Sequence, residues 1–146
     1  MLAYVDTSML VKRYLPELGS DEFEARLLAE QPDLLVSELV QPELTSALRR
    51  RVRQGHIDAD YLDDALESFQ QDLRRSAIRL GRLDGACLQR ASALLRKLQA
   101  PLATLDALHL ATALEHACDM LFTSDLQFAR AASEAGLSCW PSAESA

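Results

Sequence analysis

Short apolar runs alternate with longer segments of helical periodicity along the chain. The apolar runs predict buried strands at residues 2–5, 34–37, 78–83, 120–123 and 137–140, the third of them weak. Helical spacing of apolar residues predicts helices over about 8–15, 20–31, 38–54, 58–76, 84–99, 104–118 and 125–136. Strands that alternate with helices form parallel sheets covered on both faces. We therefore expect a three-layer α/β/α sandwich with a short central parallel sheet.

Local signals refine several of these helices. Ser8 is expected to cap the first helix, and Pro42 is expected in the first turn, or at a kink, of the helix over 38–54. The segment 104–118 is almost wholly apolar, which predicts a central, buried helix. At 146 residues the chain fits one domain, which we place at residues 1–141, followed by a short polar tail at 142–146.

Four carboxylates from distant segments are expected at one edge of this sheet. Asp6 and Asp125 directly follow the first and fourth predicted strands, so both belong at the carboxyl ends of strands. Glu43 and Asp106 lie in or near the first turns of helices that begin at the same edge. In open parallel sheets, ligands bind outside this edge. The four side chains are therefore candidate site residues.

Helix capping offers an alternative explanation for each acid taken alone. Asp and Glu favour helix N-termini because free N–H groups and the helix dipole stabilise them there. Capping does not explain the hydroxyl residues 7–8 beside Asp6, nor those at 123–124 before Asp125. Clustered polar side chains of this kind favour a functional site.

Crowded carboxylates repel one another, and some take up protons unless a cation neutralises them. Mg²⁺ and Mn²⁺ are hard cations that prefer oxygen ligands, and Mg²⁺ uses few carboxylates together with several waters. Such ions generate a hydroxide nucleophile and hold the attacking and leaving oxygens of a phosphoryl group. The cluster therefore favours a metal-dependent phosphodiesterase over a simple binding module.

Each of the four acids lies in a short motif. Asp6 lies in YVDTS and Glu43 ends SELVQPE. Asp106 lies in LDALHLATA, and Asp125 closes a triplet that begins at Thr123. In order and spacing these motifs resemble those of the PIN-domain nucleases, and in size the chain is similar to the VapC-type toxins of type II toxin–antitoxin systems.

The resemblance implies a role for each matching residue. It implies an Mg²⁺ or Mn²⁺ site formed by four carboxylates, Asp6, Glu43, Asp106 and Asp125. Of these, Asp125 would support a second ion or orient the attacking water. Thr123 and Ser8 would hydrogen-bond the metal-binding side chains.

The resemblance also implies a reaction and partners. Metal-activated water would attack an RNA phosphodiester in line and leave a 5′-phosphate and a 3′-hydroxyl. The protein would act as a toxin, form a homodimer and be held inactive by a small cognate antitoxin. One position departs from the family pattern, because Pro42 directly precedes Glu43 and leaves its helical register open. Glu38 is the competing second acid, although it does not fit the family spacing.

Net charge limits how this protein could bind RNA. Fifteen basic and 22 acidic residues give −7, which argues against binding by bulk charge alone. Eight of the basic residues nevertheless cluster between positions 49 and 82. Arg49, Arg50 and Arg53 are candidates for phosphate contacts. The alternative is a solvated face with salt bridges to acids such as Glu67.

Other polar or reactive residues add little. His109 follows Asp106 by three residues on the same helical face, but a histidine on so apolar a helix is more often a core residue. Cys87, Cys118 and Cys139 lack metal-site spacing and are expected to be small buried side chains. The first ten residues lack the pattern of a signal peptide, and no apolar run reaches ~18 residues. We expect a cytoplasmic protein with no membrane contact.

Three other classes of protein are alternatives to this interpretation. A haloacid-dehalogenase-type phosphatase needs a second acid two residues after the first, where this chain has Ser8. A response-regulator receiver domain needs a lysine after its last strand, and the only lysines are Lys12 and Lys97. A catalytically silent PIN-like scaffold that binds RNA or protein stays as the alternative, although the presence of all four acids argues against it.

Overall fold

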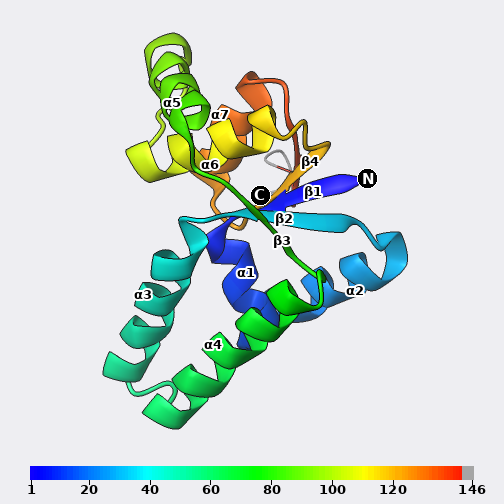
Figure 1. Cartoon of the computed structure of the whole chain (residues 1–146), viewed down its shortest axis with the longest axis vertical. Helices are drawn as coiled ribbons and strands as arrows, with labels where there is room; N and C mark the ends of the chain where they lie inside the picture. Colours follow the sequence, from blue (N-terminus) through cyan, green and yellow to red (C-terminus); the bar gives the residue numbers. More distant parts are fainter. Residues whose placement is uncertain (143–146) are drawn as a thin grey trace.

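The computed structural model describes residues 1–142 and has a five-stranded parallel sheet at its centre (Figure 1). The strands are β1 (Leu2–Val5), β2 (Asp33–Ser37), β3 (Arg79–Gly81), β4 (Met120–Phe122) and β5 (Ser138–Trp140). Their spatial order is β3-β2-β1-β4-β5, and all neighbouring pairs run parallel. Of the expected polar tail, only Ser142 falls within the described residues.

Helices cover both faces of this sheet. One face carries α1 (Thr7–Tyr14), α2 (Ser20–Glu30), α3 (Val40–Arg53) and α4 (Ala59–Arg74). The other carries α5 (Gly85–Lys97), α6 (Thr104–Glu115) and α7 (Leu126–Glu134). The expected three-layer α/β/α sandwich is therefore confirmed, including its weak third strand. Within residues 1–142, no helix has the length and apolar character needed to cross a membrane.

Two apolar clusters fix the layers, one on each side of the sheet. Along β1, Ala3 and Val5 join the cluster formed with α1, α3 and α4, whereas Tyr4 joins the cluster formed with α6 and α7. This alternation follows from the two-residue period of a strand. Helix α6 is buried in its central part, between residues 107 and 113, as its apolar composition predicts. Cys87 and Cys118 are buried free thiols, as expected, whereas Cys139 is only half-buried.

The start of α3 determines where Glu43 points. The helix begins at Val40, two residues later than expected, because Glu38 and Leu39 form a turn in which the Leu39 N–H donates to the Ser37 hydroxyl (3.1 Å). Pro42 lies in the first turn, as expected, where its missing N–H would have no helical partner. The helix passes through Pro42 without a break, and Glu43 also lies in this first turn.

Candidate active site

The site lies at the carboxyl edge of the three central strands. β2, β1 and β4 are neighbours in the sheet, so the segments that follow them lie side by side. The backbone N–H of Asp6 donates to the carbonyl of Phe122 (3.1 Å), which ties the end of β1 to the end of β4. Leu105, in the first turn of α6, lines the same cavity as Thr7 and Ser124. Four chain segments therefore converge there.

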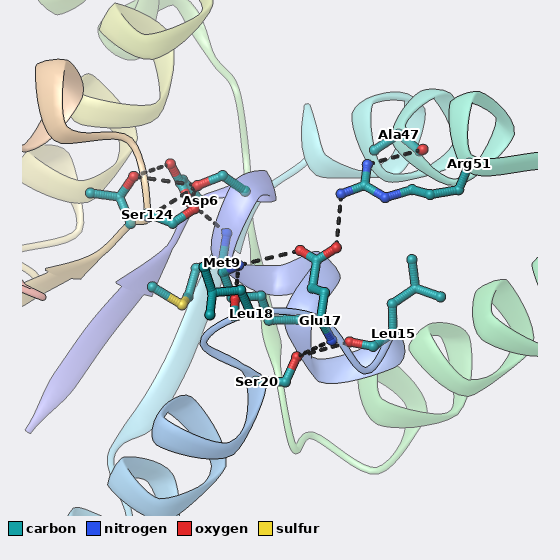
Figure 2. Close-up of polar contacts among 12 residues, drawn as sticks. Asp6, Met9, Leu15, Glu17, Leu18, Ser20, Ala47, Arg51 and Ser124 are labelled. Carbon is teal, nitrogen blue, oxygen red and sulfur yellow. Dashed lines mark hydrogen bonds and ion pairs between the residues drawn. The ribbon is translucent and has the colours of Figure 1, made fainter. Parts of the chain in front are cut away.

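Asp6 is the most constrained of the four acids. Asp6 is 3% exposed, and its carboxylate accepts hydrogen bonds from the hydroxyls of Ser8 (2.7 Å) and Thr123 (2.5 Å) and from the N–H of Met9 (3.0 Å). Figure 2 shows the contact between Asp6 and Met9. Burial raises its pKa, although these three donors and His109 act in the opposite direction. Asp6 is also the N-cap of α1. The expectation that Ser8 caps this helix is therefore wrong: the Ser8 hydroxyl donates to Asp6 instead.

Asp125 is joined to Asp6 through one side chain. The Thr123 hydroxyl donates to Asp6 and accepts from the N–H of Asp125 (3.0 Å). Asp125 also caps α7, with Oδ1 accepting from the N–H of Phe128 (3.1 Å). Asp125 is therefore a helix cap, as the capping explanation predicts. Capping uses only Oδ1, and Oδ2 has no hydrogen-bond partner among residues 1–142.

Glu43 is oriented by two donors. Its Oε1 accepts from the Thr7 hydroxyl (3.0 Å) and contacts Nε2 of His109 (2.5 Å). Burial opposes ionisation of Glu43, but the hydrogen bond and charge of His109 and the hydrogen bond from Thr7 prevail and hold its pKa below the usual range. Glu43 is therefore an ionised carboxylate at neutral pH. The competing acid, Glu38, makes no side-chain polar contact within the described part of the chain.

Burial and the charges of the other three acids raise the pKa of Asp106. Burial is the largest cause of its raised pKa, about 6, followed by the charges of Asp125 and Asp6 and, more weakly, of Glu43. Its side chain has no hydrogen-bond partner among residues 1–142. The structure thus brings all four predicted acids within electrostatic range of one another.

The donor set fits a hard divalent cation. All four candidate ligands are carboxylates, and their mutual repulsion is the charge imbalance that a cation relieves. Within residues 1–142, however, no three His, Cys, Asp or Glu side chains are close enough to form a complete metal site as they stand. Mg²⁺ keeps several of its waters and needs only one or two direct carboxylates. The arrangement is compatible with such a partly hydrated ion.

We expect the substitution Asp106→Asn to stabilise the metal-free protein at pH 7. Because the pKa of Asp106 is about 6 in the fold against 3.8 for an unperturbed Asp, its ionised form costs folding free energy above pH 6, and this cost declines as pH falls toward 4. After discounting for solvent screening at this half-buried group, we put the gain at about 1 kcal/mol. Calorimetry in EDTA should show a larger gain at pH 7 than at pH 5. A variant that melts below the wild type at pH 7 would contradict this account.

Sequence reasoning undervalues two residues of the site. His109 is a core residue, as expected, with 2% of its surface exposed, yet it also contacts Glu43. Thr7 donates to Glu43, whereas the sequence indicates only that it is a neighbour of Asp6. The three-residue spacing between Asp106 and His109 is the available signal, since it places both on one helical face.

A cavity of about 440 Å³ adjoins the acids along α3. It is lined by Thr7, Ser8, Glu43, Ala47, Arg50 and Arg51, among others. Arg51 donates to Glu17 (3.0 Å) and to the carbonyl of Ala47 (3.3 Å), as Figure 2 shows. Arg50 is exposed and has no polar partner for its side chain among residues 1–142. The cavity thus joins the acidic edge to a basic side chain that is unpaired within the described residues.

The remaining arginines lie elsewhere. Arg49 lines a different cavity, beside Pro42 and Phe69, and Arg53 is exposed without a polar side-chain contact in the described part of the chain. Farther along the chain, Arg74 pairs with Glu67 (2.6 Å), as the salt-bridge alternative predicts. Of the three arginines expected to contact RNA, the structure therefore brings only Arg50 to the cavity beside the acids.

Comparison with solved structures finds the same fold at low sequence identity. VapC20 of Mycobacterium tuberculosis, described as a sarcin–ricin-loop-cleaving toxin, has a TM-score of 0.67 at 20% identity, covering 88% of this chain and 94% of that one. VapBC2 from Rickettsia felis, bound to a promoter DNA fragment, has a TM-score of 0.67 at 17% identity, with coverages of 95% and 97%. A toxin–antitoxin complex from Klebsiella pneumoniae has a TM-score of 0.60 at 21% identity, with coverages of 84% and 86%.

Sequence comparison identifies the family. No curated protein gave a significant match. The family model for the PIN domain, however, matches residues 3–134, which run from β1 to the end of α7 and include all four acids. The family expected from the four motifs is confirmed: this chain belongs to the PIN-domain family.

Proposed function

We propose that this protein is an Mg²⁺- or Mn²⁺-dependent endoribonuclease that acts as the toxin of a toxin–antitoxin pair. The observation that carries the proposal is the convergence of four carboxylates at one sheet edge, where burial and three acidic neighbours raise the pKa of Asp106 to about 6. A cation relieves that repulsion and supplies the chemistry of phosphodiester hydrolysis. Membership of the PIN-domain family and the likeness to VapC toxins support the same function.

The four acids would have different roles in the reaction. Asp6, Glu43 and Asp106 would hold the cation, directly or through water. When bound, the cation supplies a hydroxide nucleophile and neutralises the charge of the phosphate. Asp125, with one oxygen free of hydrogen bonds from residues 1–142, would orient the attacking water or support a second ion. Thr123 and Ser8 keep Asp6 fixed through their hydroxyl groups.

The partners are an RNA substrate, a cognate antitoxin and a second copy of the chain. The cavity beside the acids would admit the RNA, with Arg50 meeting a phosphate. The similar structure from Klebsiella pneumoniae is named as a toxin–antitoxin complex, and the one from Rickettsia felis as VapBC2 bound to promoter DNA, which supports an antitoxin partner here. Homodimer formation rests on the resemblance to VapC-type toxins.

Cleavage of a mixed cellular RNA pool tests the proposal. Purified protein is incubated with Mg²⁺, with Mn²⁺ or with EDTA, and the fragment ends are mapped. We expect discrete fragments with 5′-phosphate and 3′-hydroxyl ends that appear only when a divalent ion is present. Equal cleavage in EDTA would overturn metal dependence. A folded protein that binds RNA but cleaves none of it with either ion would favour the silent scaffold.

We expect the substitution Arg50→Ala to weaken RNA binding and Arg49→Ala to leave it nearly unchanged. Each phosphate contact releases counterions, so losing one lowers the slope of log Kd against log salt by about 1. Arg49 is a matched control because it is an exposed arginine of the same helix that lines a different cavity. RNA affinity of a cleavage-deficient Asp6→Asn background, measured at several salt concentrations, checks the prediction. Equal slopes for both variants would remove Arg50 from the RNA path.

A further inference from the structure

A hydrogen-bonded chain of three side chains runs from the centre of the sheet to the acidic edge. The hydroxyl of Tyr4, on β1, contacts Nδ1 of His109, on α6 (2.5 Å). Nε2 of the same ring contacts Oε1 of Glu43, on α3 (2.5 Å). Tyr4 and His109 are 0% and 2% exposed, so no bulk water competes for either ring nitrogen. Because α6 and α3 cover opposite faces of the sheet, the chain joins the two helical layers (Figure 1).

The carboxylate of Glu43 fixes the direction of its hydrogen bond with His109. An ionised Glu43 can only accept, so Nε2 of His109 carries a proton and donates it. Nδ1 of the ring contacts the Tyr4 hydroxyl, which can donate to a neutral imidazole or accept from a protonated one. Every polar atom of the His109 ring is therefore used.

The two oxygens of Glu43 therefore differ in their hydrogen bonds. Oε1 receives both donors, His109 and Thr7, whereas Oε2 has no hydrogen-bond partner among residues 1–142. A carboxylate held through one oxygen presents the other in a fixed direction. Partners that orient a metal ligand in this way contribute to metal affinity although they do not touch the ion.

We propose that His109, itself in contact with Tyr4, is a positioning residue that holds Glu43 through Oε1 and so leaves its other oxygen available to bind the cation. The proposal rests on the metal-dependent function proposed above. A histidine serving only to fill the core would need partners for its nitrogens but would have no reason to select a carboxylate of the site. The other buried residues of α6 are Ala, Leu and Thr, so His109 is the helix's single buried imidazole.

Calorimetric titration of the full-length protein with MnCl₂ tests the proposal without measuring activity. His109→Leu removes the donor while keeping an apolar side chain in the core, and His109→Gln keeps an N–H donor for Glu43. We expect His109→Leu to raise the Kd for Mn²⁺ about 10- to 100-fold and His109→Gln to recover most of that loss. His116→Leu is the matched control, because this second histidine lies at the C-cap of α6 and contacts the carbonyl of Thr112.

A double-mutant cycle separates positioning from general destabilisation. In a Glu43→Ala background the same His109→Leu change should alter the Kd by less than about twofold, because the group that His109 positions is gone. The proposal is overturned if His109→Leu binds Mn²⁺ as the wild type does, if His109→Gln binds no better than His109→Leu, or if the loss persists in the Glu43→Ala background. These outcomes leave the nuclease proposal intact. A wild-type protein that binds no Mn²⁺ would overturn both proposals.

Discussion

The substitution Asp6→Asn is expected to reduce RNA cleavage by at least about a thousandfold while leaving the fold intact. A metal-binding carboxylate is replaced by an amide, and a bound ion supplies several kcal/mol of transition-state stabilisation, with roughly 1.4 kcal/mol for each factor of ten. The fold should survive because Asn is as good an N-cap as Asp, so the N–H of Met9 keeps its acceptor. The new amide N–H can donate to the Thr123 hydroxyl, which also accepts from Asp125.

Because Asp6 also caps α1, controls must separate its role in cleavage from its role as a helix cap. Asp58 also caps a helix, α4, through a hydrogen bond from the N–H of Tyr61, and it lies in the α3–α4 connection, far from the sheet (Figure 1). Asp58→Asn should therefore keep full cleavage activity. Asp6→Ala should lose both activity and about 1 kcal/mol or more of stability, since three donors lose their acceptor. Cleavage assays and thermal melts of the three variants check this, and an active Asp6→Asn protein would remove Asp6 from the reaction.

The layers of the fold can be predicted because their signals are local and strong. The runs at residues 2–5 and 34–36 are apolar on both faces, as parallel strands buried between helices must be. The strand Arg79–Gly81 is predicted only weakly, because polar residues interrupt the apolar run at 78–83. Helix ends are less certain, since the start of α3 depends on a hydrogen bond to the Ser37 side chain that no periodicity contains.

The site is predictable in outline and not in its hydrogen bonds. Strand ends and first turns place the four acids at one edge, because chain topology alone decides which segments meet there. The sequence offers two candidate caps for α1, Ser8 and Asp6, and Ser and Asp are about equally good caps. Only the structure shows that Asp6 is the one that accepts from the N–H of Met9. The spacing of Asp106 and His109 places both on one helical face, but Glu43 lies 66 residues from His109 on the opposite layer, so no local pattern identifies it as the partner of His109.

The substitution Glu43→Gln is expected to reduce cleavage at least about a hundredfold, whereas Glu38→Gln should stay within about twofold of the wild type. In the first variant the amide oxygen would still accept from the hydroxyl of Thr7 and from His109, so the local structure should persist. The amide nitrogen would replace the free oxygen of Glu43, and an amide N–H₂ cannot ligate a cation. The loss of one carboxylate charge and one ligand corresponds to roughly 3 kcal/mol or more at the transition state.

Comparison of the two variants shows whether Glu43 or Glu38 is the second carboxylate of the active site. Glu38 is held by its backbone, whose N–H donates to the carbonyl of Gly81 (3.0 Å), and its side chain contacts no polar group among residues 1–142. Glu43 instead receives its donors from α1 and α6. Rates of RNA cleavage under single-turnover conditions, with melting temperatures measured alongside, provide the comparison. A large loss in Glu38→Gln with an active Glu43→Gln would move the second ligand to Glu38, and with it the place of the cation toward the β2–β3 side of the edge.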